Sequence, residues 1–181
     1  MYKFSDALNT YIDYSQGFRR GGSNGIPISG PFAGNPALLI FTPDKTQNYE
    51  VGAKGTFNGI HYSAAVFYIN WDNFQVDATA VASGASIAVN GPKAKSKGIE
   101  LALSGAISRG LTYDIGYSYT RAQVAENFTV TDFNTSKVPV AIITGKNGDP
   151  LPSAPKNSAT VAFDYIHAAP RSTDCVGRCS R

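Results

Sequence analysis

The sequence predicts an all-β protein: an antiparallel, up-and-down meander of about six long strands, forming an open, curved section of a transmembrane β-barrel. Three observations support this fold class. Apolar and polar residues alternate with a period of two over several segments. Short turns and long loops alternate strictly along the chain. The composition suits strands, because 10 Tyr, 10 Phe and 18 Gly occur among 181 residues of which only 16% are charged.

The clearest alternation places apolar side chains at the odd positions of residues 99–103, 111–119 and 159–165. The polar residues between them suit a wet lumen, and the apolar ones suit lipid. The predicted lipid-facing residues are Ile99, Leu101, Leu103, Tyr113, Ile115, Tyr117, Val161 and Phe163. Residues 60–75 are apolar on both faces, so their facing is left open.

The connections between strands predict a barrel more specifically than the strands do. Asn58-Gly59 fits a two-residue hairpin, since both residues tolerate positive φ. Further tight turns are expected at residues 108–110 and 4–7, and long Gly-, Pro- and Asn-rich loops at about 16–46, 77–92 and 125–155. In outer-membrane barrels the turns on one side of the membrane are short and the loops on the other side are long.

Several other classes of protein are disfavoured. The formal net charge of +3 is too small to indicate nucleic-acid binding, and no apolar run approaches the length of a transmembrane helix. No nucleophile, metalloprotease or phosphate-loop motif is present, so neither an enzyme nor a cofactor is expected. Cys175 and Cys179 lack the further ligands of a structural zinc site.

Two arginines and three lysines are the candidate binding residues. Arg19 and Arg20 lie where the first strand gives way to the first long loop, where they suit an anionic ligand; the alternatives are solvation or a pair with Asp44. Lys93, Lys95 and Lys97 are in phase with Ile99 and are expected to point outward, toward the phosphates of lipopolysaccharide. The alternatives are a β-bulge that turns them inward, or simple solvation.

Six segments, in order, resemble segments of TonB-dependent receptors, the active transporters of Gram-negative outer membranes. Among them are Lys95-Ser96-Lys97-Gly98-Ile99-Glu100-Leu101 and Asn48-Tyr49-Glu50-Val51-Gly52-Ala53-Lys54. The other four are residues 14–22, 65–71, 116–120 and 151–156.

The resemblance implies a barrel of about 22 strands closed by a plug, importing ferric siderophores or similar scarce nutrients. We therefore expect residues 1–166 to be a partial barrel without plug or terminal strands, and residues 167–181 to be a disordered tail unrelated to the family. The expected location is the outer membrane, with lipid and lipopolysaccharide as partners and TonB as a partner of the intact receptor only. The alternatives are a small passive porin or structural barrel, and a secreted carbohydrate-binding β-sandwich.

Overall fold

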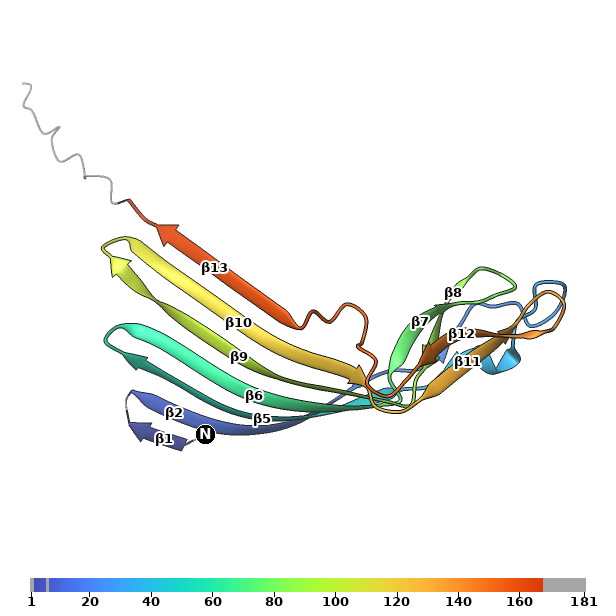
Figure 1. Cartoon of the computed structure of the whole chain (residues 1–181), viewed down its shortest axis with the longest axis horizontal. Helices are drawn as coiled ribbons and strands as arrows, with labels where there is room; N and C mark the ends of the chain where they lie inside the picture. Colours follow the sequence, from blue (N-terminus) through green and yellow to red (C-terminus); the bar gives the residue numbers. More distant parts are fainter. Residues whose placement is uncertain (1, 6, 168–181) are drawn as a thin grey trace, which may run out of the picture.

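A single antiparallel sheet dominates the computed structural model, which describes residues 2–5 and 7–167. Its seven strands follow one another in chain order, as an up-and-down meander does. They are β1 (Tyr2–Ser5), β2 (Leu8–Arg19), β5 (Asp44–Phe57), β6 (Ile60–Asp72), β9 (Lys93–Ser108), β10 (Leu111–Val124) and β13 (Asn157–Tyr165). Figure 1 shows them as one curved, open panel, with β1 and β13 at its edges. The predicted fold class is confirmed.

The tight turns form at one end of the panel and the long connections extend from the other (Figure 1). Asn58 and Gly59 have φ angles of 49° and 77°, as a two-residue hairpin of the Asn-Gly type requires. Gly110, with φ of 82°, serves the turn between β9 and β10. The alternation of short and long connections that the sequence predicted is thus present in the structure.

The pairing of the strands determines which residues share a face. From Lys45 to Phe57, β5 pairs with β6 without a register shift, and β6 pairs with β9 equally regularly. One row across the sheet runs Ile12–Val51–Val66–Ile99–Tyr119. The sequence left the facing of residues 60–75 open. The pairing settles it for β6, residues 60–72, whose even positions lie on the face of Ile99.

On the opposite face of β6, the apolar residue Phe67 has a local reason. Phe67 lies over Gly98 of β9, where a Cβ atom would overlap both its ring and the carbonyl oxygen of Tyr119. A ring laid across a glycine on the neighbouring strand covers backbone that would otherwise be exposed. The apolar residue therefore replaces the missing side chain of its neighbour and does not indicate a second lipid-facing surface.

The long connections contain more regular structure than the sequence predicted. Each forms a small two-stranded sheet: β3 (Gly22–Ser23) with β4 (Ile40–Phe41), β7 (Gln75–Thr79) with β8 (Ser86–Asn90), and β11 (Phe128–Phe133) with β12 (Pro139–Gly145). A 3₁₀ helix, η1 (Pro36–Leu38), follows Asn35, whose side chain accepts a hydrogen bond from the N–H of Ala37. None of the helical segments in the described residues has the length and apolar character that a membrane-crossing helix needs.

We call the seven-stranded sheet the wall. The buried hydrophobic residues lie among these connections and at the loop end of the wall, where Ala94 of β9 and Val124 of β10 are buried. One cluster contains residues of all three long connections. Its buried members are Ile26, Leu38, Ala80, Ile87 and Val89, and Val130 and Ile143 pack against them. A second cluster, formed by Phe74, Ala94 and Val124, lies where the wall meets the loops. We call the packed connections the loop module (residues 20–43, 73–92 and 125–156). In the described residues no second sheet covers the apolar face of the wall, so the β-sandwich alternative is wrong.

Glycine 98 offers a test of the wall packing. Gly98→Ala should destabilise the folded state by about 1–3 kcal/mol, because the added methyl group overlaps backbone as well as the Phe67 ring. Gly116→Ala is the matched control, since the atom nearest to its Cβ is 3.9 Å away. The fraction of protein that migrates as a folded, heat-modifiable band in detergent gels measures the effect. Equal folded fractions for the two variants would contradict the packing described here.

Candidate functional site

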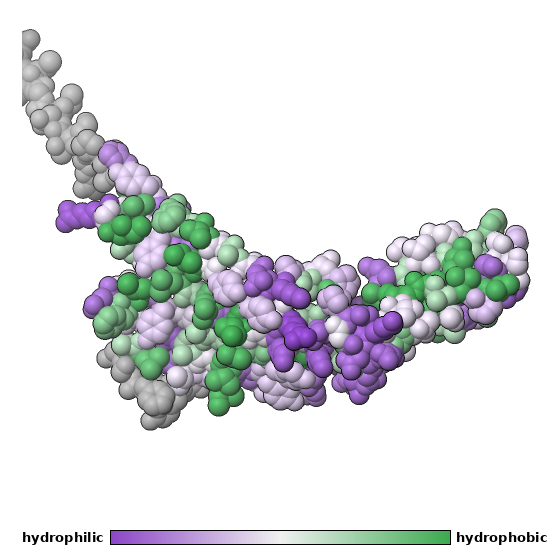
Figure 2. Space-filling view, in the orientation of Figure 1, coloured by the Kyte–Doolittle hydropathy of each residue, from purple (hydrophilic) through white to green (hydrophobic). Residues whose placement is uncertain are grey.

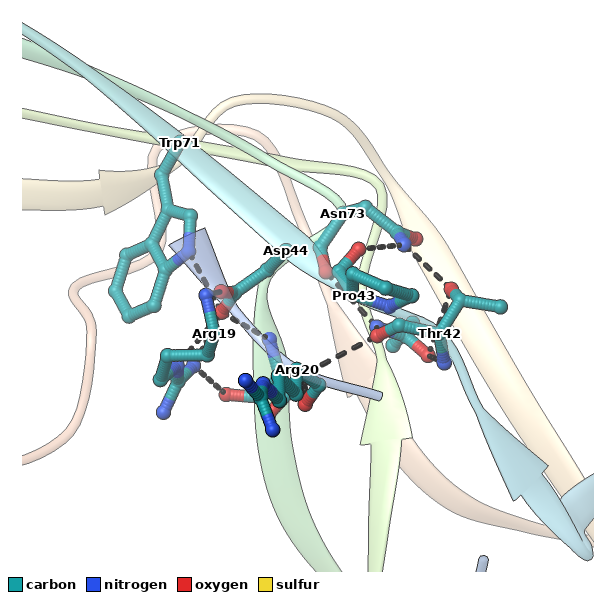
Figure 3. A network of polar contacts seen from close by, with 9 residues as sticks. Arg19, Arg20, Thr42, Pro43, Asp44, Trp71 and Asn73 are labelled. Carbon is teal, nitrogen blue, oxygen red and sulfur yellow. Dashed lines mark hydrogen bonds and ion pairs between the residues drawn. The ribbon is translucent and has the colours of Figure 1, made fainter. Parts of the chain in front are cut away.

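Asp44 is the polar centre at the base of the loop module, where β5 begins. Its side chain is only 1% exposed. The backbone N–H of Arg19 donates to Oδ1 at 3.0 Å, and Oδ2 accepts from Nε of Arg19 at 2.8 Å and from Nε1 of Trp71 at 2.9 Å. The carboxylate thereby ties β2 to β5 and β6 (Figure 3). A buried carboxylate with this many donors is satisfied as an anion.

The charge on Asp44 is held by these contacts. Burial raises the pKa of the Asp44 carboxyl. The hydrogen bonds from Arg19, Trp71 and the amide of Gln75 lower this pKa by more than burial raises it, so the net shift is downward. Asp44 lies five residues beyond Tyr49 on the loop side, about 16 Å along the strand, and so outside the part of β5 expected to cross the membrane.

Arg19 therefore has a structural partner. Its Nη2 is 2.5 Å from Oδ2 of Asp44, its guanidinium carbon lies 5.1 Å from the centroid of the Trp71 ring, and Nη2 also donates to the carbonyl of Gln75 at 3.2 Å. This is the pairing with Asp44 that the sequence offered as an alternative to ligand binding. Anion binding by Arg19 and Arg20 stays a prediction. Both arginines are exposed, but only Arg20 has a guanidinium that makes no ion pair within the described part of the chain.

Side-chain amides connect the first loop to the second. Asn90 accepts from the N–H of Thr42 at 2.8 Å and donates to the carbonyls of Thr42 and Asn73 at 3.0 and 2.9 Å. Gln75 donates to the carbonyls of Arg20 and Thr42 at 3.0 and 3.1 Å. Deeper in the module, Asn24 exchanges hydrogen bonds with the backbone of Ala88, again from the first loop to the second.

Asp132 connects all three loops. It is fully buried, at 0% exposure. Its Oδ1 accepts from the N–H groups of Asn35 at 2.7 Å and Phe133 at 2.8 Å, and its Oδ2 accepts from the N–H of Val81 at 2.8 Å. One carboxylate thus satisfies backbone donors from the first, second and third connections. Lys137 adds a further link between the third loop and the first, donating to the carbonyl of Ala33 at 2.7 Å.

The predicted lipid-facing residues share one face of the wall. Tyr113 and Ile115 pair in register with Phe163 and Val161 of β13, and Ile115 and Tyr117 with Leu103 and Leu101 of β9. Val161 and Phe163 are 61% and 62% exposed. In Figure 2, apolar residues gather over the wall strands, and strongly polar ones where the strands give way to the loops.

The three predicted lysines also lie on this face. β9 pairs regularly with β6 from Lys93 to Ser104, so no bulge turns the lysines inward. They differ in their partners, however. Nζ of Lys93 is 2.9 Å from Glu126, which raises the pKa of Lys93. Lys95 and Lys97 instead line a depression with Tyr68, Arg121 and Gln123.

Sequence reasoning missed Asp132, Asn90, Asn24 and Arg121. The face of Arg121 could have been predicted, because the odd-position alternation of residues 111–119, continued by one step, puts Arg121 on the same face. The buried polar residues carry no such signal, since each acts on backbone groups far away in the chain. In the described residues no three His, Cys, Asp or Glu side chains come together as a metal site. Cys175, Cys179 and the predicted tail lie outside the described residues, apart from His167.

A single-layer meander with hairpins at one end and packed loops at the other is the architecture of an outer-membrane transporter wall. Comparison with known families gives the same class: the family described as "TonB dependent receptor-like, beta-barrel" matches residues 1–173. The chain belongs to this family, whose members are receptors and transporters and not enzymes.

Particular relatives narrow the comparison. The chain is 30% identical over 138 residues to the ferric-pyoverdine 358 receptor of Pseudomonas putida, covering 72% of the chain and 15% of that receptor. It is 27% identical to the pesticin receptor of Yersinia enterocolitica over 122 residues, covering 67% of the chain and 17% of that receptor. The chain thus spans about a sixth of the length of these relatives.

Solved structures share the fold. The ferric yersiniabactin uptake receptor of Yersinia pestis superposes with a TM-score of 0.66 at 20% identity, over 93% of this chain and 22% of that one. A siderophore receptor of Acinetobacter baumannii gives a TM-score of 0.59 at 21% identity, over 91% and 22% of the two chains.

Replacing Asp132 tests whether the loops form one unit. Asp132→Ala leaves three N–H donors without their acceptor and should lower the local stability of the loop module by about 2–4 kcal/mol. Amide hydrogen exchange at Asn35, Val81 and Phe133 should then accelerate together. Asp77→Ala is the control, because Asp77 is exposed on β7 and should leave exchange unchanged. Faster exchange at Phe133 alone would show that the carboxylate does not couple the loops.

Proposed function

We propose that the chain is a section of the wall of an outer-membrane receptor that imports ferric siderophores, energised in the intact protein by TonB. The observation that carries the proposal is the combination of an open meander wall with one packed loop module on the side of the long connections. The relatives named for ferric-pyoverdine and ferric yersiniabactin support the class of cargo.

The two faces of the wall suit different surroundings. The row through Ile12, Val51, Val66 and Ile99 is apolar and exposed, as is typical of barrel residues that contact lipid. The other face carries Glu50, which accepts a hydrogen bond from Tyr11 at 2.6 Å, and the carboxylate of Glu100. Polar groups and small residues on this face suit the lumen, against a plug of the intact receptor. The open edges at β1 and β13 are where further wall strands would pair.

The loop module suits the entrance through which the cargo would reach the intact receptor. Binding loops work best when a rigid scaffold positions them. Here the scaffold is the set of hydrogen bonds made by the buried carboxylates of Asp44 and Asp132 and by the half-buried amide of Asn90. Its exposed apolar side chains, including Ile28, Phe32 and Val138, suit contact with a large and partly apolar cargo. Iron is here part of the cargo and not a resident cofactor.

Iron uptake in the native bacterium tests the proposal. Deleting the coding sequence should abolish uptake of radioactive iron bound to at least one siderophore of the pyoverdine or yersiniabactin type, and the wild-type gene should restore it. Uptake should also stop when TonB is removed or the proton gradient is collapsed. Uptake of copper serves as the control for general damage to the membrane.

The outcomes separate the hypotheses. Unchanged uptake of every ferric siderophore would overturn the proposal that the cargo is a ferric siderophore. Uptake that persists without TonB would favour the passive porin that the sequence left as an alternative.

A further inference from the structure

Two positive charges face each other directly on the outer surface of the wall. Lys97 of β9 and Arg121 of β10 are register partners, and Lys95 lies one outward-facing step further toward the loops, opposite Gln123. Directly opposed like charges on one face of an antiparallel pair are destabilising. The sheet therefore tolerates an unfavourable contact at this position, which the folded chain does not itself relieve.

The neighbouring carboxylates are occupied elsewhere. Glu126 forms its ion pair with Lys93, and Asp72 lies in the same row as Lys93 and Lys45. Within the described part of the chain, Lys95, Lys97 and Arg121 take part in no ion pair. Lys93, which the sequence grouped with the other two lysines, is thus neutralised locally, while Arg121 takes its place in the unpaired group. We call Lys95, Lys97 and Arg121 the cation triad.

The triad lies at a defined level of the wall. Its row across the sheet reads Tyr14–Tyr49–Tyr68–Lys97–Arg121, and the row on its hairpin side is Ile12–Val51–Val66–Ile99–Tyr119. The rings of Tyr14 and Tyr49 lie 5.0 Å apart. Tyrosines collect at the boundary between hydrocarbon and water, where the ring is buried and the hydroxyl hydrated. The triad is therefore level with the aromatic boundary and next to the apolar band.

The length of β9 agrees with this level. Ser108, the last residue of the strand before the hairpin, is eleven positions after Lys97. At about 3.3 Å per residue and a tilt of about 35–45°, that stretch crosses about 26–30 Å. The apolar band of outer-membrane barrels is about 25 Å tall. The triad thus lies where the headgroups of the outer leaflet begin.

The surface at the triad is hollowed. Tyr68, Lys95, Lys97, Arg121 and Gln123 line a depression of about 390 Å³. Gln123 is anchored by its donation to the carbonyl of Gly148 at 2.8 Å. A guanidinium beside two ammonium groups matches the geometry of a phosphate, which accepts a forked pair of hydrogen bonds from arginine and single contacts from lysine.

We propose that the cation triad binds a phosphate group of a glycolipid of the outer leaflet. The phosphate oxygens accept hydrogen bonds from Arg121, Lys95 and Lys97, the Tyr68 ring lies against the sugar, and the acyl chains lie along the apolar rows through Ile99. The proposal rests on the membrane location of the wall in the proposed function and is independent of the cargo. It differs from the sequence-based expectation in its residues, because Arg121 belongs to the site and Lys93 does not.

The test uses the protein as it is produced in the outer membrane, purified in detergent. The triple variant Lys95→Gln/Lys97→Gln/Arg121→Gln is compared with Lys54→Gln/Arg109→Gln/Lys146→Gln, which also removes two lysines and one arginine, at positions away from the triad. Binding of bisphosphorylated lipid A is measured by native mass spectrometry, with dephosphorylated lipid A as the second probe. We expect the triad variant to bind bisphosphorylated lipid A roughly tenfold more weakly or worse, and the control variant to match the wild type.

Further measurements keep the outcomes distinct. Lys95→Arg/Lys97→Arg keeps the charges and should retain the lipid, and the heat-modifiable band shows whether each variant is folded. Equal lipid binding by the triad and control variants would overturn the site. Equal binding of phosphorylated and dephosphorylated lipid A would overturn the proposal that the site recognises a phosphate group. Displacement of the lipid by millimolar inorganic phosphate would show that the site binds a free anion and not a glycolipid. Intact iron uptake in a variant that loses lipid leaves the cargo proposal standing.

Discussion

The uninterrupted register of the wall strands is the constraint on which the other features depend. In an antiparallel sheet the side-chain period is two, so a slip of one residue would move every side chain of a strand to the opposite face. The pairing of β5, β6 and β9 contains no such slip, and the pairing of β9 with β10 shifts only beside the hairpin, at Leu111. One regular ladder thereby places the apolar rows, the tyrosine row and the cation triad on one surface, and Glu50 and Glu100 on the other.

The loops are ordered by a different interaction. Their backbone cannot be satisfied by the wall ladder, and short strands such as β3 and β4 contribute few hydrogen bonds of their own. Buried carboxylates and amides supply the missing acceptors, and they do so between loops. Asp132 serves backbone donors of three connections, and Asp44 joins the end of β2 to the beginning of β5 and to Trp71 of β6. Because Asp44 belongs to a wall strand, the position of the loop module follows from the register of the wall.

The sequence predicted the features that depend on local rules. Alternation predicted the strands and their faces, and Asn58-Gly59 predicted its hairpin, because both are encoded within a few consecutive residues. The partner of Arg19 was anticipated only as an alternative, since pairing with Asp44 requires two strands to be in register. The loop module was not predicted, because Asp132 meets Asn35 and Val81 across 97 and 51 residues of chain. The face of Arg121 follows from the local alternation of residues 111–119, but its position opposite Lys97 follows only from the pairing of β9 with β10.

Burial is distributed in this chain in the opposite way to a soluble sheet protein. The buried apolar side chains lie among the loops and at the loop end of the wall, whereas the wall exposes Ile12, Val51 and Val66 on a surface that no other part of the described chain covers. Such a wall gains no hydrophobic stabilisation in water, so the apolar rows stabilise it only in contact with lipid. The loop module needs no lipid, because its clusters are closed by residues of the chain itself. The row of tyrosines and the cation triad lie between these two parts of the chain. The proposed glycolipid site accounts for the unpaired positive charge there, because a lipid bound at this level would supply both an apolar chain and an anionic headgroup.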